Sequence, residues 1–115
     1  MALTLILFAH CLWLLLTAHV LCDTVLQGGL SQMKNPTHNP PGSGQMPWQV
    51  AMLAHGMIHG TAVLLITGSF ALCITEAVAH AIIDYMKCSG RIGIKTDQAM
   101  HAILKVLYAA TVALS

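Results

Sequence analysis

Charged residues are scarce in this chain of 115 residues: Asp, Glu, Lys and Arg together make up 8% of it. Soluble domains are about a quarter charged. Hydrophobic residues make up 57% of the chain, and its mean hydropathy is +0.74. A soluble domain of this length could not bury so much apolar surface. The composition therefore argues against an ordinary soluble domain and predicts a small integral membrane protein in contact with the lipid bilayer.

Basic patches and aromatic residues are also lacking. The formal net charge is only +1, and aromatic residues make up 5% of the chain. Proteins that bind nucleic acid need clustered Lys and Arg, often with aromatic residues on which bases stack. We therefore expect no nucleic acid among its partners. The sequence does not indicate an oligomeric state.

Paired cysteine motifs are missing as well. Cys11, Cys22, Cys73 and Cys88 show no C-x-x-C spacing, and each lies in or at the end of an apolar run. Such cysteines act mostly as small apolar side chains. We expect neither a disulfide framework nor thiolate metal ligands.

The N-terminal apolar run lacks the positively charged start of a signal peptide. Residues 2–22 are also longer than the usual hydrophobic region of such a peptide. The segment from Val20 to Asp23 resembles a lipoprotein cleavage box, but Leu21 stands where a small residue is needed. We therefore expect this run to remain as a membrane helix.

Hydropathy and turn residues predict an all-α bundle of four transmembrane helices that forms one membrane domain over residues 1–115. About 20 apolar residues cross the hydrocarbon core. Turn signals end the apolar runs at Gly28 and Gly29, and at Thr67–Gly68–Ser69, while Thr96 is a plausible N-cap. The predicted helices cover residues of about 2–26, 48–66, 70–87 and 96–115, with a polar loop rich in Pro and Gly at 30–47.

The positive-inside rule predicts the orientation. Lys34, Arg91 and Lys95 lie in the two longer connections, and Lys87 lies beside the second of them. The termini and the turn near Gly68 carry no Lys or Arg. Since cytoplasmic loops are enriched in these residues, we expect a multi-pass protein with both longer loops in the cytoplasm and both termini outside.

Ionisable residues occur in pairs at the same end of each predicted helix, which is the most informative pattern of the sequence. The pairs are His19/Asp23, His55/His59, His80/Asp84 and Asp97/His101. Residues four apart share one face of a helix, so each pair can present two donor atoms to a common point. Metal sites in four-helix bundles are built in this way. The pattern predicts a buried divalent-metal site, with Zn²⁺ as the first candidate.

The same residues resemble a known family. The ordered pattern runs His19-x-x-x-Asp23-x-x-x-Gln27, Lys34, His55-x-x-x-His59, Glu76-x-x-x-His80-x-x-Ile83-Asp84-x-x-Lys87 and Asp97-Gln98-x-x-His101. It resembles, over nearly the whole chain, the bacterial and phage membrane proteins called domain of unknown function 3307. More loosely, it is similar to proteins labelled membrane-bound metal-dependent hydrolases. The resemblance implies a bacterial inner-membrane location and suggests hydrolysis by analogy. Thr24 departs from the family, which commonly has an aromatic residue there.

Two functions remain open at this point. In the first, a metal-dependent hydrolase acts on a lipid or headgroup, with Glu76 or Asp84 as the catalytic base. Its candidate metal ligands are His19, Asp23, His55, His59, His80, Asp84 and His101. In the second, the same residues are a proton or ion relay, or hydrogen-bonding glue between helices. Glu76 is expected to orient His80.

A few polar residues are predicted to lie apart from the site. We expect Lys34 and Lys87 to extend toward the membrane surface, and Asp97 to act either at the site or only as a favourable charge at a helix start. The role of Gln27 is left open. His10 and His38 are predicted to lie away from the site.

Overall fold

The chain folds into five helices and contains no strand, which confirms the all-α prediction. The computed structural model describes all 115 residues. Its elements are α1 (Ala2–Asp23), α2 (Leu30–Met33), α3 (Trp48–Thr67), α4 (Phe70–Cys88) and α5 (Ile94–Leu114). The four long helices lie close to the predicted ranges, whereas the single turn of α2 was not predicted.

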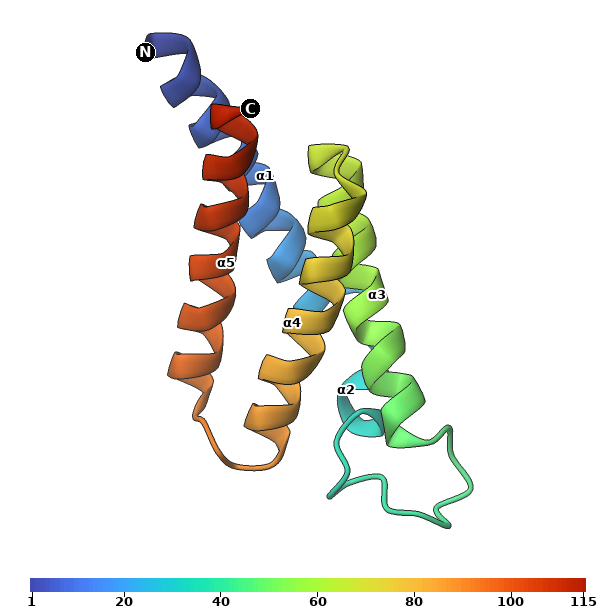
Figure 1. Cartoon of the computed structure of the whole chain (residues 1–115). Coiled ribbons are helices and arrows are strands. Elements are labelled where there is room, and N and C mark those ends of the chain that lie inside the picture. Colours follow the sequence, from blue (N-terminus) through green and yellow to red (C-terminus); the bar gives the residue numbers. More distant parts are fainter.

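The long helices alternate in direction within a bundle that measures 55 × 25 × 22 Å. Both termini and the α3–α4 turn lie at one end, which we call the terminal end (Figure 1). The α1–α3 connection and the α4–α5 connection lie at the opposite end, which we call the loop end (Figure 1). This alternation agrees with the predicted arrangement of termini and longer loops.

The α3–α4 turn forms where the sequence predicts it. Gly68 closes α3 with a φ of +69°, in the left-handed region that residues with a Cβ rarely adopt. Ser69 then starts α4, and its hydroxyl accepts a hydrogen bond from the Leu72 amide at 3.3 Å. The turn reverses the chain so that α3 and α4 lie side by side.

Two glycines bring α3 and α4 into close contact. A Cβ added at Gly56 would lie 2.6 Å from the Ala77 carbonyl oxygen, and one at Gly60 would lie 2.6 Å from the Cys73 carbonyl oxygen. Only glycine fits at such distances, as in the small-xxx-small contacts of membrane helices. This close approach carries the residues that flank the glycines on α3 toward α4.

Two helix ends differ from the prediction. The first helix ends at Asp23 rather than near residue 26, because turns take over between Thr24 and Gly29 and Gly28 has a φ of +47°. The last helix begins at Ile94, with Gly93 rather than Thr96 at its N-cap. Asp23 is therefore the last residue of its helix.

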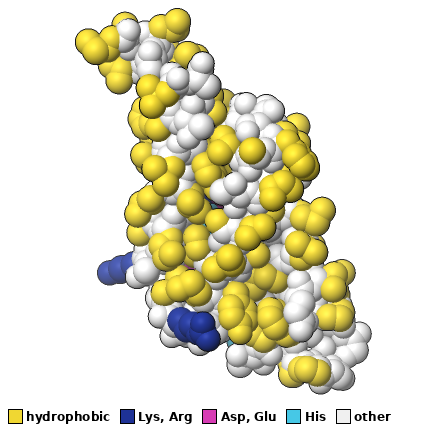
Figure 2. Space-filling model, viewed as in Figure 1, with side chains coloured by type: hydrophobic (Ala, Val, Ile, Leu, Met, Phe, Trp, Pro, Cys, Tyr) yellow, Lys and Arg dark blue, Asp and Glu magenta, His cyan; other side chains and the backbone are white.

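The interior and the surface are reversed relative to a soluble protein. Ionisable side chains fill much of the interior, whereas large apolar side chains such as Leu65, Ile82 and Leu107 are exposed, at 81%, 55% and 55%. Figure 2 shows a face covered largely by hydrophobic side chains, with basic side chains only toward the loop end and no acidic ones in view. Exposed apolar surface of this extent is unusual for a soluble monomer.

Length and composition identify two candidate membrane spans, α1 and α3. The four predicted spans are thus not all confirmed. Helices α4 and α5 do not qualify because ionisable residues, including Asp84 and Lys105, lower their hydropathy.

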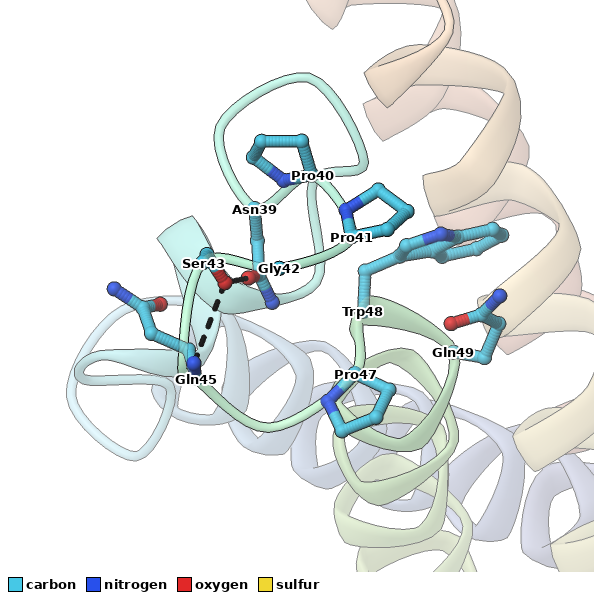
Figure 3. A pocket seen from close by; sticks show the side chains of 9 residues that line it. All are labelled: Asn39, Pro40, Pro41, Gly42, Ser43, Gln45, Pro47, Trp48 and Gln49. Carbon is cyan, nitrogen blue, oxygen red and sulfur yellow. Dashed lines mark hydrogen bonds between the residues drawn. The ribbon is translucent and has the colours of Figure 1, made fainter.

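The loop between α2 and α3 is folded around Asn39. The buried Asn39 amide donates hydrogen bonds to the carbonyl oxygens of Met33 at 2.8 Å and Met46 at 2.7 Å. Figure 3 shows the hollow beside this loop, lined by prolines, Asn39 and Trp48. The hollow contains no ionisable side chain. Trp48 stacks on Tyr85 with ring centres 5.4 Å apart.

Candidate metal centre

All four acidic residues of the chain and five of its seven histidines lie in one cluster in the loop-end half of the bundle. The histidines and Glu76, Asp84 and Asp97 are buried, and the Asp23 side chain is 14% exposed. The members are His19 and Asp23 from α1, His55 and His59 from α3, Glu76, His80 and Asp84 from α4, and Asp97 and His101 from α5. All seven predicted metal ligands therefore come together. The residues converge because the four long helices pack together, each contributing polar residues of its own.

Asp23 lies at the centre of one donor set. Its Oδ1 lies 3.2 Å from His55 Nε2 and 3.0 Å from His59 Nε2, both on α3. His80 Nε2 of α4 lies 3.5 Å from the same oxygen and 3.1 Å from His55 Nε2. Three helices thus direct four donor atoms toward one point, a set we call the Asp23 set.

These spacings fit a tetrahedral ion. Zn–N and Zn–O bonds of about 2.0–2.1 Å place neighbouring ligand atoms about 3.3 Å apart. Four contacts within the Asp23 set run from 3.0 to 3.5 Å. Three imidazoles and one carboxylate are also a donor combination that Zn²⁺ accepts.

A shared cation would satisfy these contacts more fully than hydrogen bonds between neutral rings. A neutral imidazole carries one N–H and one acceptor nitrogen. If His55 Nε2 donates to Asp23, it cannot also accept from His80 Nε2, which lies 3.1 Å away. A shared cation removes the conflict, since both nitrogens then face it as lone-pair donors.

Several buried polar atoms in the cluster have no hydrogen-bond partner. Both ring nitrogens of His19 and of His101 belong to this group, as do Glu76 Oε2 and Asp97 Oδ1. Buried polar atoms without a partner are rare in folded proteins, and each calls for water or an ion. His19 Nε2 also approaches Asp23 Oδ2 at 3.3 Å, so it is available as an additional donor.

Asp84 lies beside the Asp23 set. Its Oδ2 lies 3.3 Å from His55 Nε2 and 3.7 Å from His80 Nε2, and its Oδ1 lies 3.6 Å from His101 Nε2. Asp97 Oδ1 lies 3.5 Å from the same His101 nitrogen. Asp84, Asp97 and His101 thus form a second donor group on α4 and α5.

Two lysines neutralise this second group. The Lys34 ammonium contacts Asp84 Oδ2, and the Lys34 residue is only 3% exposed. Lys87 Nζ lies 3.4 Å from Asp84 Oδ1 and 3.3 Å from Asp97 Oδ2. The expectation that Lys34 extends outward is wrong, because its ammonium contacts the buried Asp84 carboxylate. The Lys87 side chain stays 27% exposed while its ammonium contacts both carboxylates. Asp97 contacts the site and is not merely a charge at a helix start.

Glu76 lies on the terminal-end side of the imidazoles and pairs with Lys105. Lys105 Nζ donates to Glu76 Oε1 at 2.6 Å, and both residues are buried. The same oxygen lies 3.4 Å from His80 Nδ1 and 3.9 Å from His59 Nδ1, the ring nitrogens opposite those that face Asp23. Carboxylates in this position hold the ring orientation of metal-binding histidines.

Sequence reasoning missed Lys105 and the two packing glycines. Lys105 stands four residues after His101 and eight after Asp97, so it continues the same helical face. Gly56 and Gly60 stand four apart on α3, a spacing typical of close helix contacts. Both signals were present in the sequence.

Of the remaining polar residues, two glutamines lie beside the site and two histidines lie away from it. Gln27 donates to the Asp23 backbone oxygen at 2.7 Å, and Gln98 donates to Asp97 Oδ2 at 2.8 Å, so both border the site. His10 is exposed, and its Nδ1 contacts the Ile6 carbonyl at 3.1 Å. His38 lies exposed in the loop. These two histidines lie outside the cluster, as expected.

Comparison with known proteins gives no match to a family model, a curated protein or a solved structure. The resemblance to domain of unknown function 3307 therefore stays a prediction.

Proposed function

We propose that the chain is a membrane-embedded metalloprotein whose Asp23 set holds one divalent ion, with Zn²⁺ as the first candidate. The observation that carries the proposal is the approach of three imidazole nitrogens from α3 and α4 to one oxygen of Asp23, at 3.0–3.5 Å. A divalent ion would also offset the cost of keeping carboxylates away from water.

A single divalent ion is favoured over two, because the second donor group, of Asp84, Asp97 and His101, is already paired with lysines. Asp84 and Asp97 already face two ammonium groups, those of Lys34 and Lys87. A second divalent ion there would meet two like charges at close range, which is unfavourable in a buried site.

A four-span membrane bundle is supported by the burial of most charged side chains of α4 and α5. Glu76, Asp84, Asp97 and Lys105 are at most 1% exposed, so they lower the hydropathy of their helices without facing outward. The exposed side chains of α4 and α5 include Ile74, Val78, Ile82, Ile103, Val106 and Leu107. A lipid-facing surface of this kind is compatible with spanning.

We place the loop end on the cytoplasmic side of a bacterial inner membrane. Arg91 and Lys95, the exposed basic residues, lie in or beside the α4–α5 connection. The positive-inside rule assigns such a connection to the cytoplasm. The site then lies in the cytoplasmic half of the membrane.

Hydrolysis is the reaction that the residues around the Asp23 set suit best. A bound divalent ion would supply Lewis acidity toward water and toward a polar substrate bond, which requires that the ion accept one ligand beyond the Asp23 set. Asp84 is the carboxylate beside the set, 3.3 Å from His55 Nε2, and we assign to it the role of proton acceptor. Glu76 is assigned a positioning role, since it contacts the His80 ring nitrogen opposite the one that faces Asp23.

The alternative of a transmembrane relay has less support. The polar chain continues from the cluster through Glu76 and Lys105 toward Tyr108, whose ring lies 5.6 Å from Lys105 Nζ. Beyond it, Tyr108 packs in an apolar cluster with Leu15 and Val63. A relay requires polar groups that continue toward the other face.

Metal analysis of the full chain tests the proposal. Protein purified in uncharged detergent with Zn²⁺ is expected to retain about one equivalent of zinc. The variants Asp23→Asn and His55→Ala should retain less than about a tenth of an equivalent, since the first replaces the carboxylate by a weakly coordinating amide and the second removes an imidazole. Asp23→Asn preserves the size of the side chain, so a loss of zinc there is not a packing effect.

The matched controls are His10→Ala and His38→Ala, which remove histidines outside the cluster. Both should retain the zinc of the parent. Equal zinc in all five proteins, or only traces in the parent, would contradict the metal centre and favour interhelical hydrogen bonding as the role of the cluster.

A further inference from the structure

A polar pocket of about 280 Å³ opens at the loop end, next to the candidate metal centre. Its lining includes Gln27, Gln32, Lys34, Asn35 and Lys87. Lys34 and Lys87 form its floor, because their ammonium groups contact Asp84 and Asp97 of the centre. The two lysines therefore connect the pocket to the cluster.

Charge within the cluster determines which ligand the pocket suits. The four carboxylates face three ammonium groups, those of Lys34, Lys87 and Lys105. With neutral imidazoles the cluster carries one net negative charge, and a bound divalent ion changes this to one net positive charge. The metal-loaded centre therefore attracts an anion, and the pocket with its lysines is the polar opening beside it.

The hydrogen-bonding groups of the pocket match a phosphate group. An ammonium carries three N–H donors, whereas Lys34 contacts only Asp84, which leaves donors for a ligand. Asn35 Oδ1 accepts from the Thr37 amide at 2.9 Å, so its NH₂ group is the donor available to the pocket. Gln27 Oε1 is buried without a partner and provides an acceptor for a hydroxyl group.

We propose that this pocket binds the phosphate group of the substrate and presents it to the metal centre. The inference rests on the proposed function and names its substrate class, a phosphate ester. The pocket opens at the end of the bundle where lipid headgroups would lie, so the ester can belong to a phospholipid headgroup or to a soluble phosphate ester.

The test measures binding of inorganic phosphate to the zinc-loaded full chain in maltoside micelles by titration calorimetry. Asn35→Asp is the main variant, since its Oδ1 can still accept from Thr37 while the side chain adds a negative charge at the pocket. We expect phosphate affinity to fall about tenfold or more, by repulsion across several ångströms in a partly hydrated site. Gln49→Glu adds the same charge at an exposed position outside the pocket and should leave the affinity unchanged.

A second variant removes a floor ammonium. Lys87→Gln should also weaken phosphate binding, whereas Arg91→Gln, which removes an exposed charge, should not. Zinc content is measured in every sample, so that loss of phosphate binding is not confused with loss of the ion. Equal phosphate affinity in all variants, or no phosphate binding by zinc-loaded protein, would overturn the proposed phosphate site. Neither outcome would contradict the proposed metal centre.

The same titration separates this inference from the metal proposal. If the parent holds no zinc, the metal proposal fails, and phosphate is titrated against the metal-free chain. Weaker binding in Asn35→Asp would then still support the pocket, and absence of binding would overturn it. Competition by glycerol phosphate indicates a soluble ester, whereas stronger competition by phosphatidic acid in mixed micelles indicates a lipid headgroup.

Discussion

The two halves of the bundle have opposite interiors. Toward the loop end, the interior holds the carboxylates and imidazoles of the candidate metal centre. Toward the terminal end, it is an apolar cluster of Cys11, Leu15, Val63, Tyr108 and Ala109. Figure 2 shows hydrophobic side chains over both halves on one face, with basic side chains toward the loop end only. The comparison teaches that the interior of one half is organised by charge and that of the other by apolar packing.

The boundary between the halves is the buried pair of Lys105 and Glu76, and breaking it should have the largest effect. Lys105→Met leaves the Glu76 carboxylate buried without its partner. We expect a loss of about 4 kcal/mol in the free energy of unfolding, because an uncompensated buried charge is costly. The measurement is denaturation in mixed micelles, followed by tryptophan fluorescence.

The double variant Glu76→Gln/Lys105→Met is the matched control, since it removes both charges. Its stability should return most of the way to that of the parent. A single variant within about 1 kcal/mol of the parent would show that the pair does not hold a charge buried at the boundary.

Leu15→Ala tests the packed half. Leu15 is 1% exposed at the centre of the apolar cluster, so the truncation leaves a cavity. We expect the protein to lose about 3 kcal/mol of stability and to retain its zinc, since no metal donor changes. Leu65→Ala, at an 81% exposed position, should cost far less. Loss of zinc in folded Leu15→Ala would show that the two halves are coupled.

Gly60→Ala tests the contact that both halves share. The new Cβ would lie 2.6 Å from the Cys73 carbonyl oxygen, so α3 and α4 must move apart. We expect a loss of about 2 kcal/mol of stability and weaker zinc binding, because His59 and His80 are carried by these two helices. The free energy of unfolding and the zinc content are measured on the same preparation.

Gly29→Ala is the control for this substitution. Gly29 has a helical φ of −64°, and an added Cβ would meet only the end of the Met33 side chain at 3.5 Å. Its stability should match that of the parent or slightly exceed it. Equal costs at both positions would mean that the close approach of α3 and α4 is unimportant.

Much of the helical architecture could be predicted from local signals. Apolar run lengths indicated four long helices, and Gly68 and Ser69 marked the α3–α4 turn. The end of α1 and the start of α5 differ from the prediction by two to three residues. The turns after Asp23 and the N-cap at Gly93 lack strong side-chain signals. The single turn of α2 is too short to produce a periodic pattern.

The i, i+4 spacing of His and Asp by itself determined which residues share a helical face, because the period of the α-helix is fixed by its backbone. Composition likewise determined that the exterior would be apolar. Only the tertiary structure decided that three nitrogens from two helices approach one oxygen of Asp23, that Lys34 and Lys87 turn inward to Asp84, and that Lys105 pairs with Glu76. These contacts depend on how closely and at what rotation the helices pack, which the spacing within one helix does not specify.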